Sequence, residues 1–516
     1  MKAVIMAGGQ GTRLRTVSSE LPKPMVPVCG KPILQYQIEN LRDNDITDLI
    51  LVVGYLGEAI RDYFGDGSAF GVRIQYYTET YPLGTAGALY FLRESLSENF
   101  LLLMGDLMLS VDFGRFMAAH RAAGGLATLF VHPNAHPYDS DIIVTETVGK
   151  PEDYTEAAMA RRMAELTGIG AGLGAAPVTA EQAWMETGAA AGSEGAARLV
   201  RGVIGKKEPR SHFYHNQVNA GIYALSPALL QTLSAPKTEA ALKAELFRAK
   251  KTGASEEEQK RIWKSAKLDL DMDVILPQIG AGRVYAYHST EYVKDMGTPE
   301  RYAAVSADLE NGTVASRNLR QAQKCIFLDR DGTINKAAGF VKLPEQLELL
   351  PRAAEAIRRI NASPYLAIVV TNQPVLARGE VSFAGLDEIH AKLETELGKA
   401  GAYVDDLLFC PHHRDRGFAG EVPALKFDCP CRKPKPGLIL EAARRYHIDL
   451  SRSWMIGDMT QDIACGRAAG LRTVLLETGE GGRDGKYEVK PDKVAADLLN
   501  AVEGILRETD GFSARK

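Results

Sequence analysis

Runs of apolar residues alternate with amphipathic segments along the chain, and they do so in two separate stretches. In the first stretch the runs are KAVIMAGG, DLILVVG, RIQYYTE, NFLLLMGD, LATLFVHP and VNAGIYAL. Helical patterns, such as those at residues 31–44 and 85–97, lie between some of these runs. Alternation of apolar strands with helices is typical of a mostly parallel sheet that is covered by helices. The pattern therefore predicts an α/β fold.

A polar segment after Tyr302 interrupts this alternation, and we interpret it as the end of a helix followed by a linker. A new apolar strand, CIFLD, then begins a second strand-helix series that runs to VLLET near residue 477. The two series share no motif. We predict two Rossmann-like domains, a mixed sheet at residues 1–310 and a second domain at 324–510, joined by a linker at 311–323.

Two segments of the first domain do not follow the alternation, and we interpret them as insertions. Residues 149–199 are rich in Ala and Gly around one charged helical piece at 156–166, and their small side chains offer little apolar area for a core. Residues 237–266 have the pattern of one or two exposed helices. We expect both to be peripheral, with a lid or an oligomer contact as the alternative.

The composition and charge argue against a nucleic-acid-binding or membrane-spanning protein. The 516 residues are 45% hydrophobic and 24% charged, and the formal net charge is −4. There is no basic field to hold a nucleic acid, and no apolar run approaches the ~18 residues of a membrane-spanning helix. The first residues have a strand pattern and not that of a secretory signal. We expect a cytoplasmic protein with neither a nucleic-acid nor a membrane partner, and self-association stays open.

Glycines and cations follow the first strand. The loop after KAVIMA contains Gly8, Gly9, Gly11, Thr12 and Arg13. Glycines at the end of a strand let backbone N–H groups turn toward an anion. Arg13, and Lys23 further on in LPKPM, add fixed positive charge for a triphosphate. The loop and the two cations together indicate a site for a nucleotide.

This segment resembles the nucleotidyltransferases that make nucleoside-diphosphate sugars from a sugar 1-phosphate and a nucleoside triphosphate. The resemblance continues through PLGTAG at 82–87, GD at 105–106, NAGIY at 219–223 and YVKDMGTP at 292–299. The resemblance implies the following binding residues: Gly84 and Thr85 for the base and sugar, Asn219 for the sugar, Lys206 or Lys207 for the sugar phosphate, and Asp106 and Asp295 for Mg²⁺.

These residue types suit nucleotidyl transfer. An oxygen of the sugar phosphate would attack the α-phosphorus while pyrophosphate leaves in line, so the site must align and neutralise two anions. Two carboxylates at strand ends can hold Mg²⁺ between them, and Arg13 and Lys23 would steady the transferring group. Glu79 could accept hydrogen bonds from N1–H and N2–H₂ of guanine, with a solvated strand-end charge as the alternative.

A second set of reactive residues follows the strands of the C-terminal half. Asp329 and Asp331 come directly after CIFL. The first carboxylate can attack a phosphoryl group, and the second can protonate the leaving oxygen and later deprotonate water. Thr371 ends LAIVV, where its hydroxyl can bind a phosphoryl oxygen, and Lys433 can offset the negative charge. Asp458 ends SWMI, where it can complete a Mg²⁺ site.

The order of these residues resembles that of the haloacid-dehalogenase-type phosphatases. Only 41 residues separate Asp329 from Thr371, which leaves no room for a large helical cap and predicts an open site. The resemblance implies the following further roles: Mg²⁺ binding by Asp329, Asp331 and Asp458, with Asp462 one turn further, and substrate binding by Asn372 and Arg432.

Three of the six cysteines lie close together between Thr371 and Lys433. Cys410, Cys429, Cys431 and His412 give three thiolates and one imidazole, a set suited to a closed tetrahedral Zn²⁺ site, with His413 as the competing imidazole. We expect this structural zinc to position Arg432 and Lys433, which follow it directly. The remaining cysteines are expected to be packing residues: Cys29, Cys325 and Cys465.

The cysteine loop and the motif DRDGTIN at 329–335 together resemble the heptose 1,7-bisphosphate phosphatases over residues 324–508, and the histidinol-phosphate phosphatases have a similar loop. Two positions depart from the pattern: Pro374-Val375 follow Thr-Asn-Gln, and Met459 follows Gly-Asp.

The two resemblances together imply a bifunctional enzyme whose partners are small sugar phosphates and a nucleoside triphosphate. It would remove the C7 phosphate of D-glycero-D-manno-heptose 1,7-bisphosphate and then transfer GMP from GTP to the heptose 1-phosphate, with Mg²⁺ at both sites. Three alternatives stay open. They are the same reactions with another base or sugar, such as ADP-heptose; a phosphatase carrying a nucleotide-sugar-binding regulatory module; and a phosphatase half that is an inactive zinc-stabilised scaffold.

Overall fold

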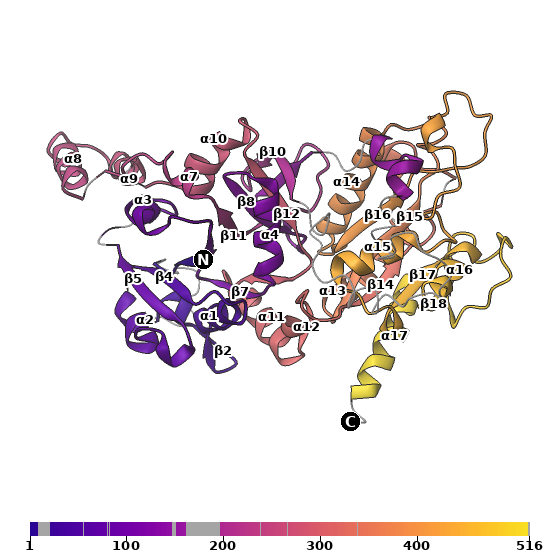
Figure 1. The fold of residues 1–516 in the computed structure, drawn as a ribbon, viewed down its shortest axis with the longest axis horizontal. Helices are drawn as coiled ribbons and strands as arrows, with labels where there is room; N and C mark the ends of the chain where they lie inside the picture. The colour runs from indigo at the N-terminus through magenta and orange to yellow at the C-terminus, as the bar shows by residue number, and fades with distance from the viewer. Residues whose placement is uncertain are drawn as a thin grey trace. The chain divides into compact units, whose positions relative to one another are not determined.

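The structure, a computed structural model, describes residues 1–8, 21–54, 56–79, 81, 83–146, 151–160, 197–237, 239–265, 267–337 and 339–513. The predicted phosphate-loop residues Gly9, Gly11, Thr12 and Arg13 lie outside these ranges. The chain forms two compact units, the first of residues 1–131, 195–203 and 219–315 and the second of 132–194, 204–218 and 316–516. Figure 1 labels their elements. These units differ from the division predicted from the sequence because 132–194 and 204–218 group with the second unit.

The first unit is built on a mixed sheet. Its strands lie in the order β5 (Arg73–Thr78), β4 (Asp48–Val53), β1 (Lys2–Met6), β6 (Phe100–Met104), β11 (Val218–Leu225), β8 (Ala127–His132), β12 (Val284–His288) and β10 (Arg198–Ile204). β1 is parallel to both β4 and β6, whereas β11 is antiparallel to β6. Ala3, Val4 and Ile5 of β1 are fully buried, as expected of a central strand that is covered on both faces.

Helices cover this sheet, and they include the two segments predicted to be helical. They are α1 (Ile33–Asp43), α2 (Gly57–Phe64), α3 (Gly87–Leu92), α4 (Phe113–Ala123), α7 (Pro227–Leu230), α10 (Leu276–Ile279), α11 (Pro299–Glu310) and α12 (Thr313–Ser316). The segment at 237–266 forms α8 (Glu239–Lys251) and α9 (Glu256–Ser265). Two small antiparallel strand pairs complete the unit: the hairpin of β2 (Pro27–Val28) and β3 (Lys31–Pro32), and the pair that β7 (Leu107–Ser110) forms with the distant β13 (Tyr292–Asp295).

The second unit contains a parallel sheet. Its strands lie in the order β16 (Asp406–Cys410), β15 (Tyr365–Asn372), β14 (Lys324–Leu328), β17 (Trp454–Gly457), β18 (Arg472–Leu476) and β19 (Lys493–Ala495), and every pairing is parallel. The helices are α13 (Ala353–Asn361), α14 (Phe383–Lys399), α15 (Gly437–Tyr446), α16 (Thr460–Ala468) and α17 (Leu498–Ser513). A short strand, β9 (Ile142–Thr145), pairs through Ile142 with Val218.

The continuous apolar run of β15 explains why this sheet has two cores. Leu366, Ile368 and Val370 enter one hydrophobic cluster, whereas Ala367 and Val369 enter another. Successive side chains of a strand point to opposite faces, so the two clusters lie on opposite sides of the sheet. The predicted α/β class, with two Rossmann-like domains, is confirmed.

Parts of the predicted linker and of the first predicted insertion, which was expected to be peripheral, are packed against the second unit's core or its buried charges. In the predicted linker, buried Arg317 lies 3.0 Å from buried Asp405 and also donates to the carbonyl of Tyr365. In the first predicted insertion, Tyr154 and Met159 join a core cluster of the second unit. A polar residue of the predicted linker is therefore used for a buried ion pair. The Ala- and Gly-rich insertion contains two apolar residues that anchor it to the core.

Among the described residues, no helix is both long and apolar enough to cross a membrane.

Candidate active sites

The carboxyl ends of the central strands carry the candidate residues of the first unit. Gly8 follows β1, and Asp106 follows the neighbouring strand β6. Asp295, almost 190 positions later in the chain, is brought beside Asp106 because β13 pairs with β7, with Asp295 opposite Leu107 and Met296 N donating to the Asp106 carbonyl at 3.2 Å. Lys23 makes a short ion pair with the Asp106 carboxylate. Lys23, Asp106 and Asp295 therefore lie close together, as the nucleotidyl-transfer hypothesis requires.

Arg301, which the sequence analysis missed, holds Asp295. Its guanidinium lies 2.8 and 2.9 Å from the two carboxylate oxygens, and Gly297 N donates to the same carboxylate at 2.8 Å. Burial favours the neutral acid, but Arg301 and the Gly297 amide outweigh it and lower the pKa of Asp295 below its ordinary value. Asp295 is therefore a carboxylate at neutral pH, which is the form that binds a divalent cation.

The predicted base-and-sugar loop is clamped by the residues that follow α9. Leu268 N donates to the Leu83 carbonyl at 2.8 Å, and Ala86 N donates to the Leu268 carbonyl at 2.9 Å. The Thr85 hydroxyl accepts from Leu270 N at 2.7 Å. Gly84 has φ +87°, and a Cβ there would lie 2.5 Å from the Leu268 carbonyl oxygen. The loop conformation thus depends on glycine and on the segment after α9.

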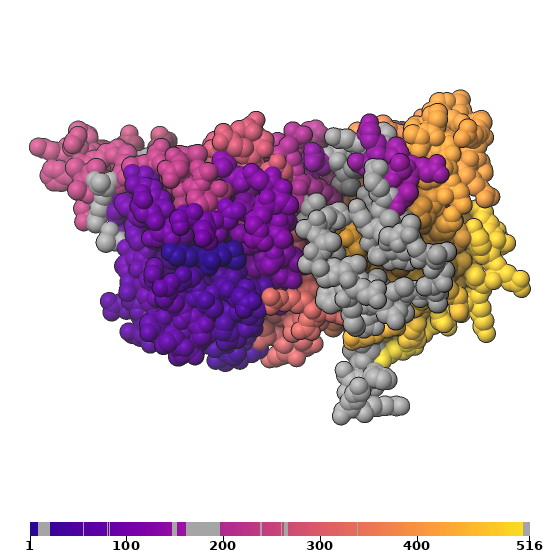
Figure 2. Space-filling view, viewed as in Figure 1, coloured from indigo at the N-terminus to yellow at the C-terminus, as the bar shows by residue number. Residues whose placement is uncertain are grey.

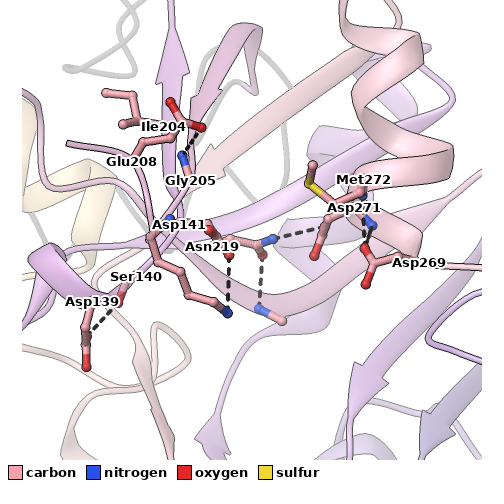
Figure 3. A network of polar contacts seen from close by, with 12 residues as sticks. Asp139, Ser140, Asp141, Ile204, Gly205, Glu208, Asn219, Asp269, Asp271 and Met272 are labelled. Carbon is pink, nitrogen blue, oxygen red and sulfur yellow. Dashed lines mark hydrogen bonds and ion pairs between the residues drawn. The ribbon is translucent and has the colours of Figure 1, made fainter. Parts of the chain in front are cut away.

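The sugar-binding candidates lie in two hydrogen-bond networks. Asn219 donates to Tyr223 at 3.1 Å and to Asp271 at 3.3 Å and accepts from Gly221 N, and Figure 3 shows the Asn219 and Asp271 side chains facing each other. Lys206 and Lys207 group with the second unit, where Lys206 N donates to Asp141 at 2.8 Å.

Glu79 lies half-buried next to Gly8, and no hydrogen-bond partner for its Oε1 is present among the described residues. Burial raises the pKa of Glu79 to about 7, although the Leu83 N–H acts in the opposite direction. A buried polar atom without a partner is costly, so this carboxyl is available to a ligand.

In the second unit the catalytic candidates meet where the order of the sheet reverses. β14 lies between β15 and β17, and Asp329, Thr371 and Asp458 stand at the carboxyl ends of these three strands. Ligands of open parallel sheets bind at such a switch point. Between Asp329 and Thr371, the described residues contain only one 3₁₀ turn and α13 as helical elements, so these residues form no large helical cap, in line with the short spacing.

A buried lysine joins the acidic groups of this site. Lys433 Nζ lies 2.5 Å from Asp329 Oδ1 and 2.7 Å from Asp462 Oδ1. Burial lowers the pKa of Lys433, but the two carboxylates together raise it above its ordinary value. Burial is also the main reason that the pKa rises to about 8 for Asp329 and to about 7 for Asp458.

The acidic groups fit a divalent cation. Ligand oxygens of Asp329, Asp458 and Asp462 lie within 4.8 Å of one another, and Asp458 Oδ1 is buried with no hydrogen-bond partner among the described residues. One lysine cannot balance three buried carboxylates, which is consistent with the raised pKa values of Asp329 and Asp458. A divalent cation would keep these groups ionised, and hard oxygen ligands suit Mg²⁺. The prediction named Asp329, Asp331 and Asp458 as ligands with Asp462 one turn further, and it is the Asp462 side chain that joins those of Asp329 and Asp458 in this group.

Asp331 instead accepts hydrogen bonds from three neighbours, Arg330, Asn335 and Gln373. Burial raises its pKa, but Arg330 and these other donors outweigh burial and lower the pKa below its ordinary value. Asp331 is thus held as a carboxylate beside Asp329. Gln373, the last residue of Thr-Asn-Gln, also donates to the Thr371 hydroxyl at 2.9 Å, and the sequence assigned it no role.

A glycine-rich loop after β18 also was not recognised, and it encloses Asp458. Glu480 N donates to Asp458 Oδ2 at 2.7 Å, and a Cβ on Gly479 would lie 2.1 Å from that oxygen. Gly332, next to Asp331, approaches equally closely, since its Cβ would lie 2.3 Å from Asp458 Oδ2. The run of glycines at the end of a strand was the available signal.

The substrate candidates Asn372 and Arg432 connect the strand ends to the cysteine loop. The Asn372 side chain donates to the Lys433 carbonyl at 3.2 Å and accepts from Lys433 N at 3.1 Å. Arg432 donates to the His412 carbonyl at 3.1 Å. The loop that carries the cysteines therefore also holds Lys433 in place.

The four predicted soft ligands form one buried group. The Cys429 Sγ lies 3.5 Å from Cys410 Sγ and 3.3 Å from Cys431 Sγ, and His412 Nδ1 lies 3.4 and 3.3 Å from the Cys410 and Cys431 sulfurs. A tetrahedron with Zn–S bonds of about 2.3 Å has edges of about 3.8 Å, so the group fits this ion with a small expansion.

The other histidine and cysteines have different surroundings. His413, the competing imidazole, contacts Arg378 instead of the thiols. Cys325 and Cys465 are buried, as expected of packing residues, but the expectation for Cys29 was wrong. Cys29 is exposed, because it stands at the tip of the β2–β3 hairpin with φ 46°.

Comparison with known proteins finds a family match in each half of the chain. The Nucleotidyl transferase family model matches residues 2–312, and the HAD-hydrolase-like model matches residues 430–501. D-glycero-beta-D-manno-heptose-1,7-bisphosphate 7-phosphatase of Rhodopseudomonas palustris is 41% identical over 145 residues, 28% of this chain and 78% of the relative. The enzyme of that name from Pasteurella multocida is 35% identical over 189 residues, 36% of this chain and 98% of the relative. The solved structure of HddC from Yersinia pseudotuberculosis is 20% identical, covers 60% of this chain and 99% of its own, and has a TM-score of 0.38.

The fold and the two sites define a fusion of a nucleotidyltransferase-type unit with a HAD-type phosphatase unit. The chain belongs to the Nucleotidyl transferase family, and its C-terminal part belongs to the family of the heptose bisphosphate 7-phosphatases.

Proposed function

We propose that the chain is a bifunctional enzyme that hydrolyses the C7 phosphate of D-glycero-D-manno-heptose 1,7-bisphosphate and then transfers a nucleotidyl group to the heptose 1-phosphate. The observation that carries the proposal is that each unit has its own set of acidic and cationic side chains at the carboxyl ends of its central strands. The identity of the C-terminal relatives supports heptose bisphosphate as the substrate of the second unit.

In the phosphatase reaction, an Asp329 carboxylate oxygen attacks the phosphorus and the bond from phosphorus to the C7 oxygen breaks. Asp331 gives a proton to that oxygen and then removes one from the water that hydrolyses the acyl phosphate. Arg330 keeps Asp331 ionised before substrate binds; the approaching phosphate dianion raises the pKa of Asp331, which then takes up from solvent the proton that it gives to the C7 oxygen. Mg²⁺ held by Asp329, Asp458 and Asp462 would neutralise charge on the phosphoryl oxygens.

In the transferase reaction, an oxygen of the sugar phosphate attacks the α-phosphorus of the triphosphate and pyrophosphate leaves. Lys23 exchanges Asp106 for the phosphoryl oxygens as substrate enters, and Arg13, from the sequence, would join it. Mg²⁺ held by Asp106 and Asp295 would offset the charge of the two reacting phosphates.

For the nucleotide base we propose guanine. The ionised carboxyl of Glu79 accepts from N1–H and N2–H₂ of guanine, and its Oε1 has no hydrogen-bond partner among the described residues. Adenine is the second candidate, because a carboxyl with a pKa of about 7 is partly protonated at neutral pH and can donate to adenine N1.

Substitution of Glu79 tests this choice of base. We expect Glu79→Gln to lower pyrophosphate release with GTP by about 10-fold, since one charged acceptor is lost. Release with ATP should change less. The measurement is pyrophosphate release from heptose 1-phosphate with each of the four nucleoside triphosphates at several pH values. Equal loss with all four nucleotides would contradict a role in base recognition.

The metal proposal for the cysteine loop is a structural Zn²⁺ bound by Cys410, His412, Cys429 and Cys431. Elemental analysis of the purified protein is expected to find about one zinc per chain, as a closed four-ligand site holds one ion. Protein that is purified without added metal and contains no zinc would contradict it.

A further inference from the structure

The metal-binding histidine has a hydrogen-bond partner that comes from far away in the chain. His412 Nε2 lies 2.7 Å from the backbone carbonyl oxygen of Tyr154, and both groups are buried. A carbonyl only accepts, so Nε2 carries the hydrogen and Nδ1 is left unprotonated. Nδ1 is the atom that faces the sulfurs of Cys410 and Cys431. The Tyr154 carbonyl therefore selects the tautomer and the ring orientation that a metal ligand needs.

The segment that supplies this carbonyl is anchored by packing. The Tyr154 ring lies 5.6 Å from the ring of Phe383, 5.5 Å from that of Phe409 and 6.1 Å from the imidazole of His412. Its side chain is almost fully buried, as is that of Met159 in the same cluster. Residues 151–160, the isolated violet segment in Figures 1 and 2, lie on the orange part of the second unit. The segment that carries the carbonyl is thus anchored by the Tyr154 ring and by Met159.

The origin of this segment distinguishes the chain from its phosphatase relatives. Residues 151–160 lie inside the range that the Nucleotidyl transferase model matches. The Pasteurella multocida relative is covered over 98% of its length by an alignment of 189 residues, so it has no transferase domain from which such a segment could come.

We propose that Tyr154 is a positioning residue of the cysteine-loop metal site, so that metal retention by the phosphatase unit depends on a segment contributed from within the transferase part of the chain. The inference rests on the proposed zinc. Outer hydrogen bonds to metal-bound histidine fix its orientation and raise its basicity, and their loss costs about 10–100-fold in metal affinity. Arg432 donates to the carbonyl of His412, so a displaced His412 also disturbs the loop that holds Lys433.

The test uses the full chain with Tyr154→Ala, which removes the ring that holds the carbonyl, and with Tyr154→Phe, which keeps it. Phe247→Ala, at an exposed aromatic residue of α8, is the control. Zinc release to a chromophoric chelator is followed over time, together with zinc content, phosphate release and pyrophosphate release. We expect release about 10–100-fold faster from Tyr154→Ala. Tyr154→Phe and Phe247→Ala should behave like the unsubstituted protein, and pyrophosphate release should not change.

The outcomes separate this inference from the zinc proposal. Unsubstituted protein without zinc overturns the metal assignment and the inference with it. Unsubstituted protein that holds zinc, with release from Tyr154→Ala at the same rate, overturns the inference alone. If Tyr154→Ala does not fold, Tyr154→Leu removes the ring contacts but leaves a smaller cavity. Zinc release faster than from Tyr154→Phe is expected of this variant, and release at the unsubstituted rate overturns the inference.

Discussion

Both candidate active sites are suited to stabilising charge on phosphate, but their charged side chains are buried to different degrees. In the phosphatase site the side chains of Lys433 and Asp462 are essentially inaccessible, at 1% and 0% exposure. In the transferase site those of Lys23 and Asp106 are 14% and 31% exposed. In the proposed reactions the first site accommodates one phosphoryl group, whereas the second admits a triphosphate and a sugar phosphate. Charges that are already desolvated need little reorganisation, and charges that face solvent can exchange partners when a large substrate enters.

We expect the largest loss of activity when the buried cation of the phosphatase site, Lys433, is removed. Lys433→Met leaves three buried carboxylates without a counterion, so we expect phosphate release to fall by about 10²–10³-fold. The free energy of unfolding without metal should fall by about 3–5 kcal/mol. Lys435→Met, two residues away at a half-exposed lysine paired with Asp428, is the matched control. Phosphate release and urea unfolding measure both effects, and equal behaviour of the two variants would show that Lys433 is not the essential counterion.

A smaller effect is expected at the nucleotide loop of the first unit. Gly84→Ala places a Cβ 2.5 Å from the Leu268 carbonyl oxygen, so the loop has to shift and pyrophosphate release should fall by about 10–10²-fold. Gly30→Ala is the matched control, because its φ of +86° is close to the +87° of Gly84 but no atom lies within 4 Å of its Cβ. Backbone strain is therefore shared by both variants, and only the clash differs. Similar loss in both would assign the effect to strain, and phosphate release should be unchanged in each.

The smallest effect concerns stability alone and depends on pH. In the second unit, His215 lies 2.7 Å from Glu394 and 3.2 Å from Asp387. Burial lowers its pKa, but the two carboxylates outweigh burial and raise the pKa to about 10. The folded pKa is above the ordinary value of about 6.5. The contribution to stability is therefore complete below pH ~6.5 and is lost as the pH rises through about 10.

Substitution of His215 measures this contribution. We expect His215→Ala to lose about 2–3 kcal/mol near pH 6.5, and the difference from the unsubstituted protein to shrink toward pH 10. Urea unfolding across this pH range provides the comparison, with His212→Ala, at an exposed histidine, as the control. A difference that does not vary with pH would mean that the imidazolium is not what Glu394 and Asp387 stabilise.

The strand ends were predictable because a parallel sheet brings its carboxyl ends to one edge. An apolar run followed by Asp, as in CIFL before Asp329 and SWMI before Asp458, marks such an end in the sequence alone. The cysteine cluster was predictable because its ligand types and pair spacing are specific to one kind of site. His412 rather than His413 could be preferred from that spacing, and the structure brings His412 to the thiols.

The missed residues depend on contacts that form only when the chain has folded. Arg301 reaches Asp295 only after the β13–α11 turn has formed, and Gln373 meets Asp331 across two strand ends. Tyr154 was overlooked because the Ala- and Gly-rich composition around it indicates no core, although one aromatic residue is enough to anchor a segment. The local sequence pattern predicts which residues end a strand, but the tertiary structure determines which of them are in contact.

The central claim is that one chain carries two independent catalytic sites. The most direct measurement supplies heptose 1,7-bisphosphate, heptose 1-phosphate and each nucleoside triphosphate to Asp329→Asn and Asp106→Asn, and follows phosphate and pyrophosphate together. The account predicts that Asp329→Asn releases no phosphate but still forms pyrophosphate from heptose 1-phosphate, and that Asp106→Asn does the reverse. Loss of both activities in either variant, or the absence of one activity from the unsubstituted protein with every nucleotide, would contradict it.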